Sequence, residues 1–215
     1  KVVLFFNYIL PLGFLFIFGQ LMGARSGGAT QVVTMVLVIG ILGNGLFGAG
    51  IRAVVERETN VLRRYKVAPI TPLPILTASM VSGWVLYLPT FVLILLLTHF
   101  LYGMPVPASL FALCVLVSLG NIALRSIGLI VAAVVNSAAE SNIIVQLLYM
   151  PMLFLSGATI PMSVFPLWLK KVAQFLPATY VYSGLQGTML RNESLPQNAV
   201  AALALLAVTA VGTFV

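Results

Sequence analysis

The residues of this sequence that could do chemistry are charged and amide side chains inside long apolar stretches. Arg125 lies in the apolar run 108–135, and a charge costs roughly 2.5–3.5 kcal/mol at the centre of a bilayer. It either faces the helix bundle and pairs with another helix, or it snorkels or bonds a backbone carbonyl, and the second interpretation is favoured. Four amides share this setting: Asn44, Asn121, Asn142 and Gln146. They could line a polar pathway, although hydrogen bonding between helices is the commoner use of such side chains.

The sequence lacks the motifs of hydrolytic and nucleotide-binding enzymes. It contains no H-E-x-x-H, no G-x-S-x-G and no G-x-x-x-x-G-K-[ST]. A single cysteine, Cys114, excludes an intrachain disulfide, and a single histidine, His99, argues against a zinc site held by this chain alone. We therefore expect a chain that is not an enzyme and holds no metal or cofactor of its own.

The elements that must position these residues are membrane-spanning helices. The chain is 61% hydrophobic and 7% charged, whereas soluble domains are about 45–50% apolar and 25% charged. Six apolar runs follow one another at residues 1–22, 32–51, 75–101, 108–135, 142–160 and 198–215. A transmembrane helix needs about 20 such residues. The sequence predicts an all-α, polytopic membrane protein: one domain over 1–215 with six transmembrane helices.

The most polar segment lies between the second and third apolar runs. Residues 52–66 hold five of the eleven basic residues, so the positive-inside rule places this segment in the cytoplasm. Its apolar residues recur at near-helical spacing, which predicts an amphipathic helix along the membrane surface, ended by Pro69 and Pro72. The net charge of +7 then reflects membrane orientation, and no nucleic-acid partner is expected.

Segment 161–190 has its own amphipathic pattern. Prolines at 161, 166 and 177 bound a stretch with apolar residues at helical intervals, and Lys170 and Lys171 lie on its other face. The segment carries too much charge for another span, so it predicts a helix at the outer interface or a re-entrant element.

Two smaller features concern helix ends and packing. Ser137 and Glu140 have the spacing of a capping box that would begin the fifth span, although a chance polar turn explains the pair equally well. Five glycines crowd residues 40–50, and close helix packing is the default explanation for them. His99 is interpreted as an interfacial residue rather than a proton relay.

Two blocks of this sequence resemble a known family. Residues 56–64 read ERETNVLRR and residues 67–72 read VAPITP; later, FLSGATIP, FPLWL and LPATY begin at residues 154, 165 and 176. Together with the six-span layout, these blocks resemble the ABC-2 type transporter permeases over nearly the whole chain. The first is similar to the coupling-helix region of that family and the second to its signature after the fifth span. One departure is Asn60, where family members commonly carry glycine.

The resemblance implies a type V exporter fold. Two permease domains, as a homodimer or heterodimer in the lipid bilayer, would face one another, and each would rest on an ATP-binding subunit or domain that holds ATP and Mg. The coupling helix 52–66 would receive force through five charged residues: Glu56, Arg57, Glu58, Arg63 and Arg64. The pathway would run along the second and fifth spans, with six candidates: Asn44, Phe47, Asn121, Asn142, Gln146 and Tyr149. The signature residues are Ser156, Gly157, Pro161, Pro166, Pro177 and Tyr180.

The predicted activity is export of an amphipathic or hydrophobic compound, such as a drug or lipid, across a bacterial inner membrane. A polysaccharide or lipid-linked glycan exporter of the same family is one alternative. A secondary transporter driven by an ion gradient is another, for which Glu140 is the only acidic candidate, at a helix start. The chain begins without Met and lacks the family's cytoplasmic lead-in, so we expect a piece truncated at both ends.

Overall fold

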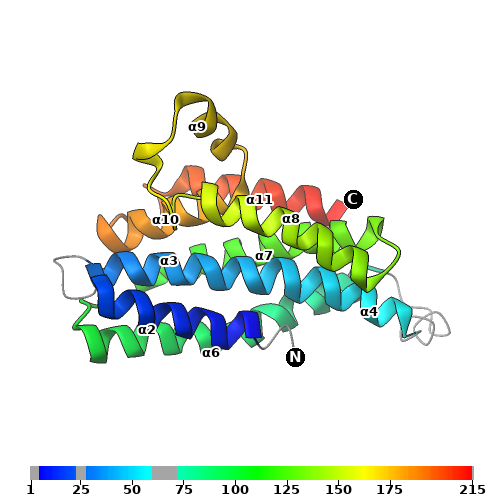
Figure 1. Cartoon of the computed structure of the whole chain (residues 1–215), viewed down its shortest axis with the longest axis horizontal. Helices are drawn as coiled ribbons and strands as arrows, with labels where there is room; N and C mark the ends of the chain where they lie inside the picture. Colours follow the sequence, from blue (N-terminus) through cyan, green and yellow to red (C-terminus); the bar gives the residue numbers. More distant parts are fainter. Residues whose placement is uncertain (1–4, 23–27, 60–71, 215) are drawn as a thin grey trace.

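The structure is a computed structural model, and it describes residues 5–22, 28–59 and 72–214. All regular elements in these ranges are helical, and the long helices run close to one common axis (Figure 1). Four helices are long and apolar enough to cross a membrane: Gly28–Glu58, Thr77–Tyr102, Leu110–Val134 and Ala138–Leu155. Two shorter apolar helices are α2 (Leu10–Met22), preceded by η1 (Phe5–Ile9), and α11 (Ala199–Phe214). The all-helical membrane fold is confirmed, and the count of six spans stays a prediction.

One continuous helix forms the centre of the bundle. It consists of α3 (Gly28–Leu42), the π-helical η2 (Gly43–Ile51) and α4 (Arg52–Glu58). Its 31 residues correspond to roughly 46 Å at 1.5 Å per residue, which exceeds a bilayer core of about 30 Å. Every residue from Val32 to Gly50 is buried, so the chain itself, rather than lipid, surrounds this helix.

The predicted coupling helix 52–66 differs from the structure in its first half. Instead of turning along the membrane surface, residues 52–58 prolong the second span, because Ile51 keeps helical backbone angles of φ −67° and ψ −41°. Residues 60–66 lie outside the described residues, so that part of the prediction is untested.

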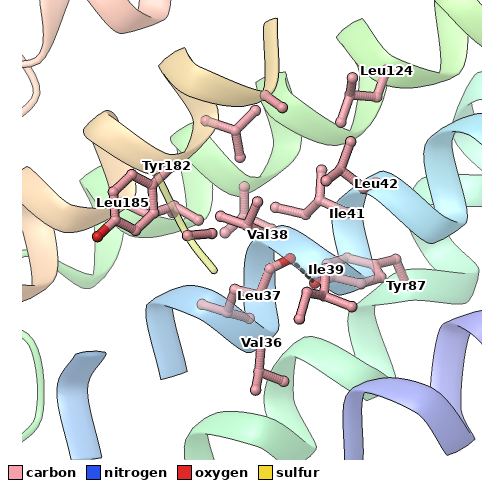
Figure 2. Close-up of a cluster of buried hydrophobic side chains, with 14 of the residues drawn as sticks. Val36, Leu37, Val38, Ile39, Ile41, Leu42, Tyr87, Leu124, Tyr182 and Leu185 are labelled. Carbon is pink, nitrogen blue, oxygen red and sulfur yellow. Dashed lines mark hydrogen bonds between the residues drawn. The ribbon is translucent and has the colours of Figure 1, made fainter. Parts of the chain in front are cut away.

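The continuous helix Gly28–Glu58 is called the central rod below, and the other helices pack on it from opposite sides. In Figure 1, α2 and α6 (Pro72–Tyr102) lie below α3, while α8 (Ala138–Leu155), α10 (Pro177–Leu190) and α11 lie above it. The close-up shows α3 side chains between Tyr87 of α6 and the pair Tyr182 and Leu185 of α10 (Figure 2). The Tyr87 hydroxyl donates to the Leu37 carbonyl at 3.0 Å. This bond fixes α6 against α3, where apolar contacts alone give little preference over lipid.

The turn between α7 (Leu110–Val134) and α8 contains the predicted capping box. The Ser137 hydroxyl accepts from the Glu140 N–H at 3.1 Å, and the Glu140 carboxylate accepts from the Asn136 N–H at 2.8 Å. The capping interpretation is therefore confirmed, with the carboxylate reaching one residue further back than in the standard motif. The predicted fifth span 142–160 was placed too late, because this cap begins the helix at Ala138 and it ends at Leu155.

Segment 161–190 divides into two parts after a short 3₁₀ turn, η3 (Met162–Val164). Helix α9 (Leu167–Gln174) stands away from the bundle in Figure 1 and exposes Leu167 and Trp168, as an interfacial helix would. Helix α10 packs against α3, α7 and α11, as a re-entrant element would. An exposed helix and a packed helix thus share the segment, and its position relative to the membrane interface stays a prediction.

Candidate functional site

A buried polar cluster around Arg125 joins three elements of the bundle: α7, η2 and α6. Arg125 is only 2% exposed, and its Nη2 donates to the Ser79 carbonyl at 2.7 Å. Its Nη1 donates to the Asn44 backbone carbonyl at 3.3 Å and to the Asn44 Oδ1 at 3.4 Å. The Asn44 Nδ2 in turn donates to the Gly83 carbonyl at 2.9 Å and to the Asn121 Oδ1 at 3.1 Å. Each interpretation of Arg125 is confirmed in part: the side chain faces the bundle and bonds two other helices, and it does so mainly through their backbone carbonyls. The snorkelling interpretation is wrong, because the charge is buried and stabilised by fixed dipoles from two neighbouring elements.

Glycines create the space for this cluster. A Cβ at Gly83 would overlap the guanidinium of Arg125. A Cβ at Gly45 would lie 2.5 Å from the Leu124 Cβ, and one at Gly128 would lie 2.8 Å from the Gly45 carbonyl oxygen. The packing interpretation of the glycine-rich second span is therefore confirmed where η2 meets α7, because no larger residue fits there.

Ser79 and Gly83 are site residues that the sequence analysis did not single out. They lie four residues apart on α6, and such pairs of small residues mark close approach between membrane helices. That spacing could have indicated a close contact between α6 and another helix. It does not indicate that the side chain of an arginine, rather than a helix backbone, lies against Gly83.

The six pathway candidates fall into a buried group and an exposed pair. Four are buried: Asn44, Phe47, Asn121 and Tyr149. The rings of Phe47 and Tyr149 meet edge to face, with centroids 5.3 Å apart. Asn142 and Gln146 are exposed and lie one turn apart on α8. The four buried candidates thus pack against other residues of this chain, and the exposed pair lies on its surface. Whether any of the six lines a pathway stays a prediction.

Three of the five coupling candidates lie in α4. The Glu56 carboxylate pairs with the Arg52 Nε at 2.8 Å, one turn away on the same helix, and both side chains are exposed. Arg63 and Arg64 lie outside the described residues. The contact of this region with a partner protein stays a prediction.

Arg57 and Glu58 make contacts to the α7–α8 turn. The Arg57 Nη1 donates to the Ala132 carbonyl at 3.1 Å, and its Nη2 donates to the Val135 carbonyl. The Glu58 Oε1 accepts from the Ala138 N–H at 2.8 Å. Both side chains therefore bond backbone groups at the ends of neighbouring helices.

The six signature residues lie where the chain leaves α8 and enters α10. The Ser156 hydroxyl accepts from the Ala158 N–H at 3.2 Å, and Gly157 adopts φ +90°, which glycine adopts without steric cost. The remaining four stand at or near helix starts: Pro161 before η3, Pro166 before α9, Pro177 as the first residue of α10, and Tyr180 in its first turn. Their placement indicates a structural role in the connection between α8 and α10.

Comparison with known proteins gives one family. The family model described as ABC-2 type transporter matches residues 1–190. The inner membrane transport permease YhhJ of Escherichia coli (strain K12) is 26% identical over 170 residues, which cover 79% of this chain and 44% of YhhJ. The linearmycin resistance permease protein LnrN of Bacillus subtilis (strain 168) is 28% identical over 164 residues, 75% of this chain and 40% of LnrN. The matched region is thus less than half of either relative, and no solved structure matches significantly.

Proposed function

Because this chain belongs to the ABC-2 type transporter family, we propose that it is the membrane domain of an ATP-driven exporter. The observation that carries the proposal is the family match over residues 1–190 of an integral membrane chain. ATP and Mg would be bound by a partner ATPase subunit or domain, and this chain would supply the transmembrane path. YhhJ is named as an inner membrane transport permease, which supports the same location for this chain. The basic residues of segment 52–66 support a cytoplasmic position for α4 by the positive-inside rule.

The central rod supports mechanical coupling. Its exposed end carries the charged residues of α4, and its body passes through the core without a break. A push on α4 would be carried along α3, because side chains packed on every face of residues 32–50 prevent the helix from bending independently.

The exposed face of α8 supports a second copy of the domain as a partner. Asn142 and Gln146 share this face with apolar side chains such as Ile143 and Leu147, which are 59% and 67% exposed. Amides are unfavourable against lipid, so this face is better suited to a neighbouring helix or a polar pathway. The pathway would then run between the two copies, along α8 and the central rod.

A drug-like or lipid-like cargo is the favoured substrate class. LnrN is named as a linearmycin resistance permease, which links a relative to resistance against a compound. A polysaccharide or lipid-linked glycan exporter is the alternative within the family.

The positions of the acidic residues argue against an ion-driven transporter. All four acidic residues of the chain lie at helix ends or in a loop, and each has a partner. Glu140, the acidic candidate for ion coupling, accepts from the Asn136 N–H as part of a helix cap. Coupling to an ion gradient generally needs an acidic side chain at membrane depth.

The test uses the full-length protein with its ATPase in inside-out vesicles. We expect ATP-dependent accumulation of a fluorescent amphipathic dye that persists after an ionophore collapses ion gradients and disappears with an ATPase variant unable to hydrolyse ATP. Accumulation that follows the ion gradient and ignores ATP would refute the proposal.

A further inference from the structure

The end of α4 lies between two helix termini of opposite polarity. The last carbonyls of α7 point at Arg57, through Ala132 and Val135, and the first N–H of α8, from Ala138, points at Glu58. The α7 C-terminus carries partial negative charge and the α8 N-terminus partial positive charge. The cation therefore meets the negative pole and the carboxylate meets the positive pole.

These contacts are stronger than ordinary surface pairs. Hydrogen bonds with one ionised partner are roughly twice as strong as neutral ones, and each here joins a side chain to backbone that cannot rotate away. The α7–α8 turn is itself held by the Ser137 and Glu140 cap. A movement of the α4 end therefore pulls on a preformed turn rather than on a loose loop.

We propose that Arg57 and Glu58 are positioning residues that lock the α7–α8 turn to the end of the central rod, so that force delivered to α4 moves α8 directly. This inference rests on the proposed function, because it needs an ATPase that pushes on α4. It adds a lateral route to the route along α3: the helix that exposes Asn142 and Gln146 is driven from its cytoplasmic end.

The chain offers a matched control one turn away. Arg52 and Glu56 lie on the same helix and carry the same charges, but they pair with each other at 2.8 Å. Arg52 is not one of the five coupling candidates, so neutralising it removes a charge from α4 without freeing the α7–α8 turn.

The first test measures coupling in the full-length protein assembled with its ATPase. In Glu58→Ala and Arg57→Ala, dye transported per ATP hydrolysed should fall about tenfold in the complexes that assemble with the ATPase. Glu58→Gln retains an acceptor oxygen and should recover several-fold of that loss, whereas Arg52→Ala should transport within about twofold of the parent. Parent-like transport by Glu58→Ala and Arg57→Ala overturns the inference and leaves the proposed function intact. Absence of ATP-driven transport in the parent protein overturns both.

The second test measures the attachment itself. In a Cys114→Ser background, spin labels at Val55 of α4 and Ile143 of α8, both exposed, should keep one distance with and without ATP. The distribution should broaden in Glu58→Ala. A change of several ångströms during the ATP cycle of the parent protein would show that α4 and α8 move separately and would overturn the inference.

A third variant separates loss of attachment from misfolding. Cysteines replacing Glu58 and Ala138 in the same background remove the carboxylate contact, and a short thiol-specific crosslinker restores a covalent link. Transport should return on crosslinking and be lost again on reduction. A crosslinked protein that stays inactive while assembled with its ATPase counts against the lock.

Discussion

Replacing Gly83 by alanine tests whether the Arg125 cluster holds the bundle together. The added Cβ would overlap Cζ, Nη1 and Nε of Arg125, where an ordinary contact needs about 3.5–4.0 Å. The α6 backbone is fixed by its own hydrogen bonds, so the guanidinium must move by roughly 1 Å or more. Arg125 then cannot keep both its 2.7 Å bond to the Ser79 carbonyl and its 3.3 Å bond to the Asn44 carbonyl.

The expected loss follows from these two bonds. A hydrogen bond to a charged group contributes about 1.5–3 kcal/mol, so losing two costs about 3–6 kcal/mol in the free energy of unfolding. Leaving a buried charge without its partners costs a similar 3–5 kcal/mol. Against this, alanine favours a helix over glycine by only about 1 kcal/mol. The clash dominates, and Gly83→Ala should be strongly destabilising.

The assay is unfolding of the purified full-length protein in mixed micelles, followed by circular dichroism during titration with dodecyl sulfate. Gly13→Ala is the matched control, because nothing lies within 4 Å of a Cβ there, and it should be neutral or slightly stabilising. In an Arg125→Ala background, Gly83→Ala should also turn neutral or stabilising, since the group it displaces is gone.

A change of sign between the two backgrounds is the diagnostic result. Equal destabilisation by Gly83→Ala with and without the Arg125 side chain would refute the reasoning, because the cost would then arise from another contact of α6. A loss below about 1 kcal/mol in the parent would show that Arg125 finds equivalent acceptors after moving.

Three further predictions concern helix ends and topology. Gly157→Ala should cost about 1–2 kcal/mol because of its φ of +90° and lower the unfolding temperature in detergent, with the Tyr182 ring only 3.0 Å from the new Cβ. Ser137→Ala removes the cap of α8 and should cost about 1 kcal/mol in the same measurement, whereas Ser137→Asp should be tolerated. Single cysteines replacing Glu56 and Trp168 in a Cys114→Ser background should react with an impermeant maleimide from opposite sides of the membrane; labelling of both from one side would contradict the proposed orientation.

The apolar helices were predictable from the sequence because their length and composition leave no soluble alternative. Runs of about 20 apolar residues satisfy all backbone groups only as helices. The start of α8 was also predictable as a possibility, since the Ser137 and Glu140 spacing is a local signal that needs no tertiary information. The end of the second span was not predictable from the sequence. The charges of Arg52 and Glu56 indicate that this part of the chain lies in water, but they do not indicate whether the helix turns at the membrane surface or continues straight into the water.

The polar contacts were less predictable because a backbone carbonyl that accepts a hydrogen bond is not marked by any residue type. Arg125 bonds the backbone of Ser79 and Asn44, and a backbone carbonyl is present at every position. Arg57 and Glu58 likewise bond main-chain groups of the α7–α8 turn. In the sequence, a charged motif whose partners are backbone atoms of the same chain has the same pattern as a charged motif that binds another protein.

The same limit applies to which spans face lipid. Lipid tails are as apolar as leucine, so composition does not separate a buried membrane helix from an exposed one. The buried α3 and the partly exposed α6 are both strongly apolar, yet α6 exposes Val92 and Phe100 while residues 32–50 expose nothing. Glycine density is the signal that does separate them, because glycines such as Gly45 let another helix approach to backbone distance. Among the described helices, the crowding of glycines just before α4 therefore marks the span that protein surrounds on all sides, and it is the span that ends in Arg57 and Glu58.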